Sequence, residues 1–196
     1  MENYKDSSRN SSDLGERLFR ARDYTPLPFL LLLVIFERPH IATVTVGCLL
    51  VFLGELIRIY SVAFIGGISR TRKGSLGERL VDDGAFRYVR NPLYIGNFFI
   101  LLGVSVFGGV PWLVILSVLF FVVQYHLIVQ YEEKILEDKF QDEFRSYKLR
   151  VPPWIPTRLP QLDDMEWPTS FSSALRSEKR TLTAILAVLF LLVLCS

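Results

Sequence analysis

Apolar residues in this chain gather into five runs that are separated by charged blocks. A transmembrane helix needs roughly 20 consecutive apolar residues. The first run, of only about twelve residues, reaches across a bilayer only when it is tilted and supported by neighbours, or else it inserts part of the way. The last run is marginal in length for a span. The runs are Thr25 to Phe36, Ile41 to about Gly67, Leu93 to about Val110, Pro111 to about Tyr131, and Thr181 to Cys195.

The breaks between the runs predict an all-α integral membrane bundle. Pro39, in the polar step between the first two runs, suits the turn of one helical hairpin. The cluster Gly108-Gly109-Val110-Pro111 suits the turn of a second. We therefore expect four parts, which are a polar N-terminal segment (1–24), a membrane domain (25–156), a linker (157–180) and a C-terminal apolar helix (181–196).

Composition agrees with a small polytopic membrane protein. Hydrophobic residues make up 51% of the 196 residues, and the formal net charge of +2 is too small to indicate a nucleic-acid partner. Cys48 and Cys195 lie far apart inside apolar runs, where we interpret them as small hydrophobic residues. The first 24 residues lack the apolar core of a signal peptide, so we do not read them as a cleaved targeting segment.

The distribution of basic residues predicts the orientation. Arginines precede the first apolar run, and six basic residues lie between the second and third runs, whereas the hairpin tips carry only Arg38. By the positive-inside rule, the N-terminus and the central loop face the cytoplasm. We expect a multi-pass protein, in the inner membrane if the source is bacterial. The residues are Arg17, Arg20, Arg22, Arg70, Arg72, Lys73, Arg79, Arg87 and Arg90.

The segment 86–96 runs from a basic, aromatic stretch into an apolar helix. Asn91 is a favoured N-cap residue, and Pro92 suits the first helical position. The free N–H groups of that helix end, with Arg90 beside them, predict a site for a carboxylate or a phosphate.

Two acidic residues end the fourth run. Glu132 and Glu133 fit a solvated pair at a helix exit, but Tyr125, Ile128 and Glu132 also follow a three-four spacing. On that second interpretation Glu132 points into the bundle, where a carboxylate can hold an ammonium group, while Glu133 points elsewhere.

Other polar residues lie inside the apolar runs. Glu55 and Arg58 share a helix face, so they form either an internal ion pair or part of a pocket for a polar head group. His126 stands alone at the middle of its run, and we assign no metal.

At this point the chain resembles the isoprenylcysteine carboxyl methyltransferase and phospholipid methyltransferase superfamily, from roughly Gly54 to Pro156. The resemblance rests on an ordered set of short motifs: Leu80-Val81, Gly84, Arg90-Asn91-Pro92-Leu93-Tyr94-Ile95-Gly96, Glu132-Glu133, Phe140, Tyr147 and Arg150-Val151-Pro152. It implies an integral membrane enzyme that binds S-adenosylmethionine on the cytosolic side and methylates a lipid or lipophilic small molecule.

The chain departs from the family pattern at several positions. Asn91 replaces the histidine of an Arg-His-Pro-x-Tyr motif. Glu78 and Phe86 replace the histidine and tyrosine of the preceding motif. Ile128 stands where prenylcysteine enzymes carry an acceptor-contacting arginine, which weakens the case for a prenylcysteine carboxylate as the acceptor.

The resemblance implies a cofactor site for S-adenosylmethionine. Arg90 and the helix start would take its carboxylate, and Glu132 its ammonium group. An apolar slot would hold the adenine. If the acceptor is an amine or a hydroxyl, Glu55 or Glu132 would be the base. The implied catalytic residues are Arg90, Glu132 and Glu55, and the implied cofactor-binding residues are Leu80, Val81, Phe86, Arg90, Asn91, Pro92, Leu93, Tyr94, Glu132 and Glu133.

Two alternatives stay open. One is a nicotinamide-dependent membrane reductase of related fold, although the chain has no glycine-rich dinucleotide motif. The other is a non-catalytic membrane scaffold, for which Asn91 and Ile128 are the motivating departures. The sequence leaves the oligomeric state and the acceptor open.

Overall fold

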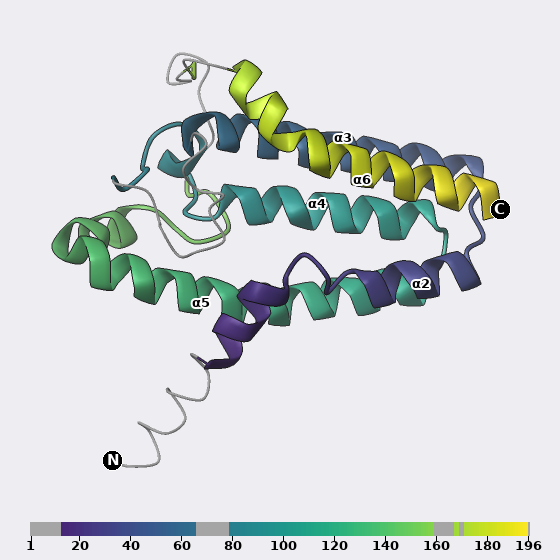
Figure 1. The fold of residues 1–196 in the computed structure, drawn as a ribbon, viewed down its shortest axis with the longest axis horizontal. Coiled ribbons are helices and arrows are strands. Elements are labelled where there is room, and N and C mark those ends of the chain that lie inside the picture. Colours follow the sequence, from purple (N-terminus) through teal and green to yellow (C-terminus); the bar gives the residue numbers. More distant parts are fainter. Residues whose placement is uncertain (1–12, 66–78, 159–166, 169–170, 196) are drawn as a thin grey trace, which may run out of the picture.

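The described part of the chain is mainly helical in the computed structural model, which covers residues 13–65, 79–158, 167–168 and 171–195 (Figure 1). Glu78 and the basic residues 70, 72 and 73 lie outside it. α3 and α5 are long and apolar enough to cross a membrane, which confirms the prediction of a membrane helical bundle. The elements are α2 (Leu27–Phe36), α3 (Ile41–Ile65), η2 (Gly84–Arg87), α4 (Pro92–Phe107), α5 (Pro111–Arg150) and α6 (Phe171–Cys195).

α3 and α4 form the most closely packed pair of helices. A Cβ atom added at Gly54 would lie 2.6 Å from the carbonyl oxygen of Gly96, and one added at Gly103 would lie 2.7 Å from that of Gly47. Only glycine permits such contact, because any side chain would force the backbones apart. The two helices therefore touch at two levels along their length.

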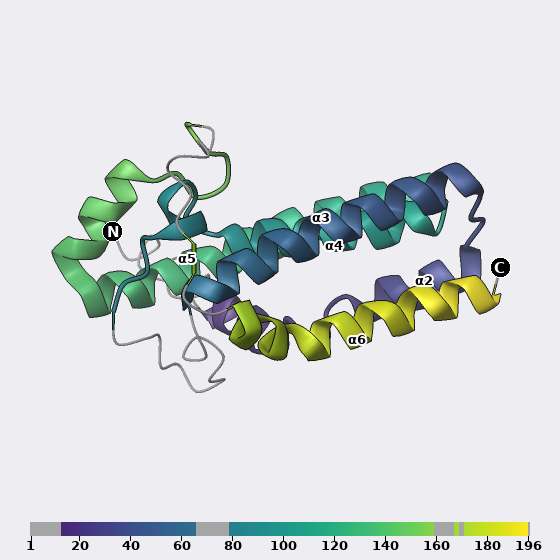
Figure 2. The ribbon, with the colours of Figure 1, turned by 90° about the horizontal axis from the view of Figure 1, so that it is seen from above.

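The first hairpin differs from the prediction. The polar step with Pro39 does separate two helices, but α2 packs mainly against α5 and α6 and lies away from most of α3 (Figure 2). One reason is a link between the two tips, where the Arg38 backbone N–H donates to the Gly108 carbonyl at 2.8 Å. Leu33, buried against Val104 and Phe107 in the main apolar cluster, holds α2 in this position.

α5 reverses its direction after the apolar run. Gln141 has φ 46° and ψ −116°, which is non-helical and lies in the region that L-residues rarely adopt. The charged part of the helix then returns, and Phe144 and Tyr147 are buried against Leu80. This reversal brings the end of α5 back to the start of α4, which positions the candidate site.

The N-terminal segment is part of the bundle, although the sequence placed it outside the membrane domain. Residues 13–21 are helical and pack on α5. The Phe19 and Tyr131 rings lie 5.8 Å apart, and a Cβ at Gly15 would lie 2.8 Å from the Leu127 carbonyl oxygen.

α6 begins at Phe171, so residues 171–180 of the predicted linker are helical. With 25 residues it is about 37 Å long. It packs against α3 and α2, and its buried Glu178 forms an ion pair with Arg58 of α3 at 2.9 Å. A charged residue inside the bundle, rather than apolar surface alone, therefore joins this helix to α3.

Candidate functional site

The junction before α4 begins a helix as predicted, but Asn91 does not cap it through its side chain. Pro92 occupies the first turn, and the Asn91 carbonyl accepts from the backbone N–H groups of Tyr94 and Ile95 at 3.1 and 3.2 Å. The Asn91 amide instead donates to the Pro153 carbonyl at 3.2 Å. The side chain is therefore directed at the segment that follows α5 and not at the free N–H groups of its own helix.

Arg90 binds the same returning segment. Its guanidinium donates twice to one oxygen of Glu133, at 2.9 and 2.7 Å, and its Nη1 donates to the carbonyls of Lys148 and Val151. Its backbone N–H donates to the Pro152 carbonyl at 2.9 Å. These bonds use most of the donors of the guanidinium. Arg90 is thus engaged with protein groups, while its role toward a cofactor carboxylate stays a prediction.

Glu133 links two cations. Its second carboxylate oxygen lies 3.2 Å from the Lys148 ammonium, and only 14% of its side chain is exposed. Buried charges of this kind require partners, because desolvation without a partner is costly. The array of Arg90, Glu133 and Lys148 therefore holds the start of α4 and both parts of α5 together.

Glu132 points the other way, into the bundle. Tyr94 of α4 donates its hydroxyl to the Glu132 carboxylate at 2.7 Å. The Tyr94 ring lies 4.7 Å from that of Tyr125, which stacks on Phe121 at 4.0 Å. A partly buried carboxylate thus stands at one end of a group of aromatic rings, and Ile128 is fully buried in the same cluster.

A second polar chain continues from these rings toward α6. The Asn97 amide donates to the Tyr125 hydroxyl at 3.1 Å, and Arg58 donates to the Asn97 carbonyl oxygen and to Glu178. The expected pairing partner of Arg58, Glu55, is buried on the same face of α3, with 5% exposure. The Arg58 guanidinium therefore binds residues of α4 and α6 as well as lying beside Glu55 on its own helix.

The residues predicted to form the adenine slot divide between two places. Leu80 is buried with Phe144 and Tyr147 in the cluster around the end of α5, whereas Tyr94 belongs to the aromatic cluster beside Glu132. The Phe86 carbonyl accepts from the Tyr147 hydroxyl at 2.8 Å. Burial raises the pKa of Tyr147, which lies in the charged part of α5 beyond the apolar run, and keeps this donor protonated. Val81 and Leu93 are partly buried, and Pro92 is fully buried.

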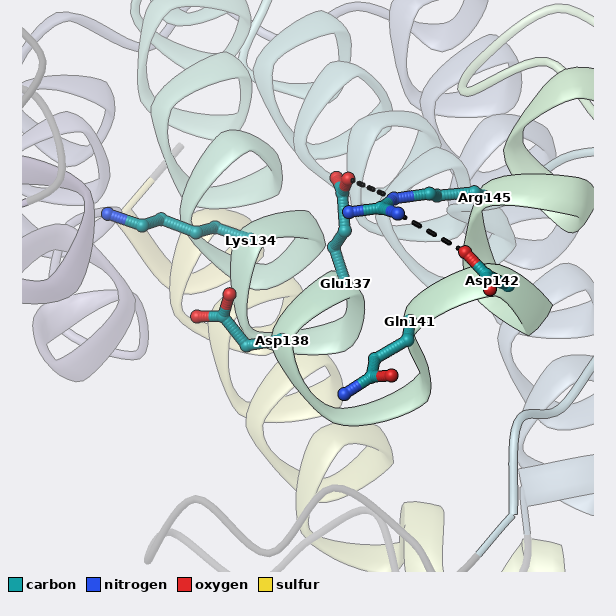
Figure 3. Close-up of a pocket in the computed structure, with 6 residues that line it drawn as sticks. All are labelled: Lys134, Glu137, Asp138, Gln141, Asp142 and Arg145. Atoms are coloured by element: carbon teal, nitrogen blue, oxygen red, sulfur yellow. Dashed lines mark hydrogen bonds and ion pairs between the residues drawn. The ribbon is translucent and has the colours of Figure 1, made fainter.

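A charged surface groove lies where α5 reverses (Figure 3). Its volume is about 410 Å³. Arg145 bridges Glu137 and Asp142 across it, at 3.0 and 3.2 Å. No aromatic or aliphatic residue lines the groove to hold an adenine, and Glu132 and Tyr94 do not line it. Its six lining residues are Lys134, Glu137, Asp138, Gln141, Asp142 and Arg145.

Sequence reasoning missed two contributions. It gave Glu133 no structural partner. Arg90 and Glu133 lie at the ends of two neighbouring apolar runs, and opposite charges at such positions indicate an ion pair. It also set aside the N-terminal segment as merely polar, although Leu18 and Phe19 interrupt its charges and both pack against the cluster of Phe121, Tyr125 and Ile128. In the part of the chain that the structure describes, no three His, Cys, Asp or Glu residues gather as a metal site.

Comparison with known proteins gives one curated relative and one family. The nickel-cobalt-cadmium resistance protein NccN of Alcaligenes xylosoxydans xylosoxydans is 29% identical over 115 residues, which are 59% of this chain and 50% of that protein. The chain thus aligns with about half the length of this relative. No solved structure matches. Residues 42–143, just over half of the chain, match the phospholipid methyltransferase family. The match spans α3, α4 and most of α5, including Arg90, Tyr94 and Glu132. The chain therefore belongs to the phospholipid methyltransferase family.

Proposed function

We propose that this protein is an S-adenosylmethionine-dependent methyltransferase that acts on a lipid or lipophilic small molecule at the cytosolic face of a membrane. The observation that carries the proposal is the Glu132 carboxylate, which stands at the end of the apolar part of α5, bonded to Tyr94 and next to aromatic rings. Both residues lie inside the family match.

The residues around Glu132 fit this cofactor. S-adenosylmethionine has an ammonium group, a carboxylate, a sulfonium and an adenine, so it needs a carboxylate, a cation and an aromatic or apolar slot. Glu132 would hold the ammonium group, and the ring of Tyr94 would border the adenine. Leu80, Val81 and Phe86, from the segment before α4, would form the other wall.

Residues 90–93 would contribute by positioning. The bonds of Arg90 and Asn91 to the end of α5 fix the direction in which α4 begins, and that direction places Tyr94 next to Glu132. Pro92 and Leu93 lie between these groups in the first turn of α4. Glu133 would act through Arg90, since it bonds the guanidinium and not the Tyr94 hydroxyl.

The cofactor supplies an electrophilic methyl group on its sulfonium, and the protein must align the acceptor with it. The Tyr94 hydroxyl would orient the Glu132 carboxylate, and the Tyr94 ring, which packs on Tyr125, would exclude water from one side of it. For an amine or hydroxyl acceptor, Glu55 or Glu132 would take the proton that the acceptor releases.

The exposed surface of the apolar helices supports placement in a membrane, from which a lipophilic acceptor would arrive. Phe52, Leu49 and Val123 are each 63% exposed, as expected for side chains that face lipid. We propose a multi-pass topology with the N-terminus in the cytoplasm, because the basic residues 17, 20, 22, 79, 87 and 90 flank the same ends of the helices.

The test is cofactor binding by purified protein in lipid nanodiscs, measured by calorimetry with S-adenosylmethionine and, separately, with NADPH. We expect wild-type protein to bind the former only. Glu132→Gln should weaken binding by about tenfold or more, because a charge-assisted bond to the ammonium is lost. Glu137→Gln, an acidic residue one and a half turns further along the same helix, is the matched control and should bind as wild type does.

The acceptor is then sought with methyl-labelled cofactor and an extract of host lipids. Label in a lipid or lipophilic fraction supports the proposal. Binding of NADPH alone would replace it with the reductase, and binding of neither cofactor would replace it with the scaffold.

A further inference from the structure

The N-terminal segment brings a second arginine to the neighbourhood of Glu132. Arg22 follows the helix 13–21, which packs on α5 through Phe19 and Tyr131. The chain after it is held by Thr25, whose hydroxyl accepts from the Gln124 amide at 2.8 Å and donates to the Arg22 carbonyl at 3.0 Å. Arg22 is therefore anchored from both sides against α5. It lies outside the residues that match the family.

The guanidinium of Arg22 has an unused donor. Its central carbon lies over the Phe19 ring, 3.9 Å from the centroid, and its Nη1 is buried with no hydrogen-bond partner. A buried donor without an acceptor costs free energy, so such groups are rare in folded proteins and mark places where an acceptor is missing.

Arg22 lies close to the Glu132 turn of α5, because the Phe19 ring beneath its guanidinium lies 5.8 Å from the ring of Tyr131, the residue before Glu132. No ion pair joins Arg22 to Glu132, although the structure describes both side chains. Each has its own support, the ring of Phe19 for Arg22 and the hydroxyl of Tyr94 for Glu132. Two opposite charges that are near each other but not in contact match the two ends of a small zwitterion.

Arg90 is poorly placed for the negative end of such a group. Its donors already bind Glu133 and two backbone carbonyls, so a ligand would have to displace bonds that hold the end of α5. Arg22 needs no such exchange, because its Nη1 bonds nothing.

We propose that Arg22 binds the carboxylate of the amino-acid end of the methyl donor, opposite the ammonium that Glu132 holds. This inference rests on the proposed function. The N-terminal segment is then part of the cofactor site, and residues 42–143 alone do not complete it.

The test compares two ligands that differ only in the carboxylate. Calorimetry is performed with S-adenosylmethionine and with its decarboxylated analogue, on full-length protein in nanodiscs. Arg22→Gln should weaken binding of S-adenosylmethionine by about tenfold or more and leave binding of the analogue unchanged, because the lost bond is to the carboxylate. Arg22→Lys should recover part of the affinity. Glu132→Gln should weaken both ligands.

Arg20→Gln is the matched control, since Arg20 is 76% exposed and pairs with Glu16 of its own helix. Equal binding of S-adenosylmethionine by Arg22→Gln and wild type would overturn the inference. So would an equal loss for both ligands, which would indicate a structural role. A wild-type protein that binds neither ligand would instead overturn the proposed function, so the two failures are distinguishable.

Discussion

Arg90 and Arg58, two partly buried arginines of the bundle, have similar exposure and different kinds of partner. The side chain of Arg90 is 9% exposed and that of Arg58 is 12% exposed. Arg90 binds Glu133 together with backbone carbonyls of residues 148 and 151. Among the described residues, Arg58 donates to two side chains, those of Asn97 and Glu178.

The difference shows what each arginine holds in place. The position of a backbone carbonyl is set by the path of the chain. Because Arg90 binds backbone carbonyls, it fixes the path by which α5 returns to α4. Side chains can be exchanged without altering the path of the chain, so Arg58 fastens one helix to another. Glu178 lies on α6, outside the residues that match the family, whereas Arg90 and Glu133 both lie inside them.

Loss of Arg90 should have the largest effect. Arg90→Met leaves a partly buried carboxylate and two carbonyls with fewer partners, and removal of one member of a buried pair costs about 3–5 kcal/mol. We expect a large fall in the thermal unfolding midpoint in detergent. Arg145→Met removes two surface ion pairs, with Glu137 and Asp142, and is the control, for which we expect a much smaller fall. Equal midpoints for the two variants would contradict the structural role of Arg90.

Loss of Glu178 should rank next. Glu178→Leu leaves Arg58 with the side-chain carbonyl oxygen of Asn97 as an acceptor, so we expect a cost near the lower end of that range, about 3 kcal/mol. The double variant Arg58→Leu with Glu178→Leu removes both charges and should recover most of the midpoint, because apolar replacement of a whole buried pair is often neutral. A double variant less stable than the single one would show that the pair stabilises the bundle outright.

A methyl group added between α3 and α4 at position 96 should displace the Arg58 side chain and weaken its contacts. In Gly96→Ala the new methyl group would lie 2.5 Å from the Arg58 side chain and 2.8 Å from the Gly54 carbonyl, and overpacking of this kind costs about 1–3 kcal/mol. Thr45→Ala, at an exposed position of α3, is the control. Cysteine cross-linking between α3 and α6 should become slower in Gly96→Ala alone.

Removal of the Tyr147 hydroxyl should have the smallest effect. Tyr147→Phe deletes one bond, to the Phe86 carbonyl, worth about 1 kcal/mol. Because the folded-state pKa of Tyr147 is raised, its contribution is fully present below pH 10, the usual value for a tyrosine, and is lost as pH rises further. Unfolding midpoints between pH 8 and 11 should therefore fall less steeply in Tyr147→Phe than in wild type.

The sequence predicted the helices well, because apolar runs and proline or glycine breaks are local signals. Pro92 begins α4, and Gly109, with φ 70°, lies in the turn before α5. It predicted their packing less well. Nothing local indicates that α2 packs away from most of α3, since that arrangement depends on the bond between Arg38 and Gly108 at distant positions.

For the candidate site, too, local features could be predicted from the sequence and contacts between distant segments could not. Its residues could be named from short motifs, but the partners of Arg90 and Asn91 could not, because they belong to a segment that returns only after the reversal at Gln141. A positive φ at a glutamine has no signature in sequence. For the same reason the N-terminal segment, which reaches α5 through ordinary aromatic packing, was assigned to the outside of the domain.

The glycine contacts of α3 and α4 also limit how a lipophilic molecule can approach Glu132. Where the backbones meet at Gly54 and Gly96, and again at Gly47 and Gly103, a single methyl group already lacks space. An acyl chain therefore cannot slide between these two helices at either level. Under the proposed function, an acceptor from the bilayer would approach along a side bordered by α5 or α6, and two pairs of the smallest residues would select its direction of entry.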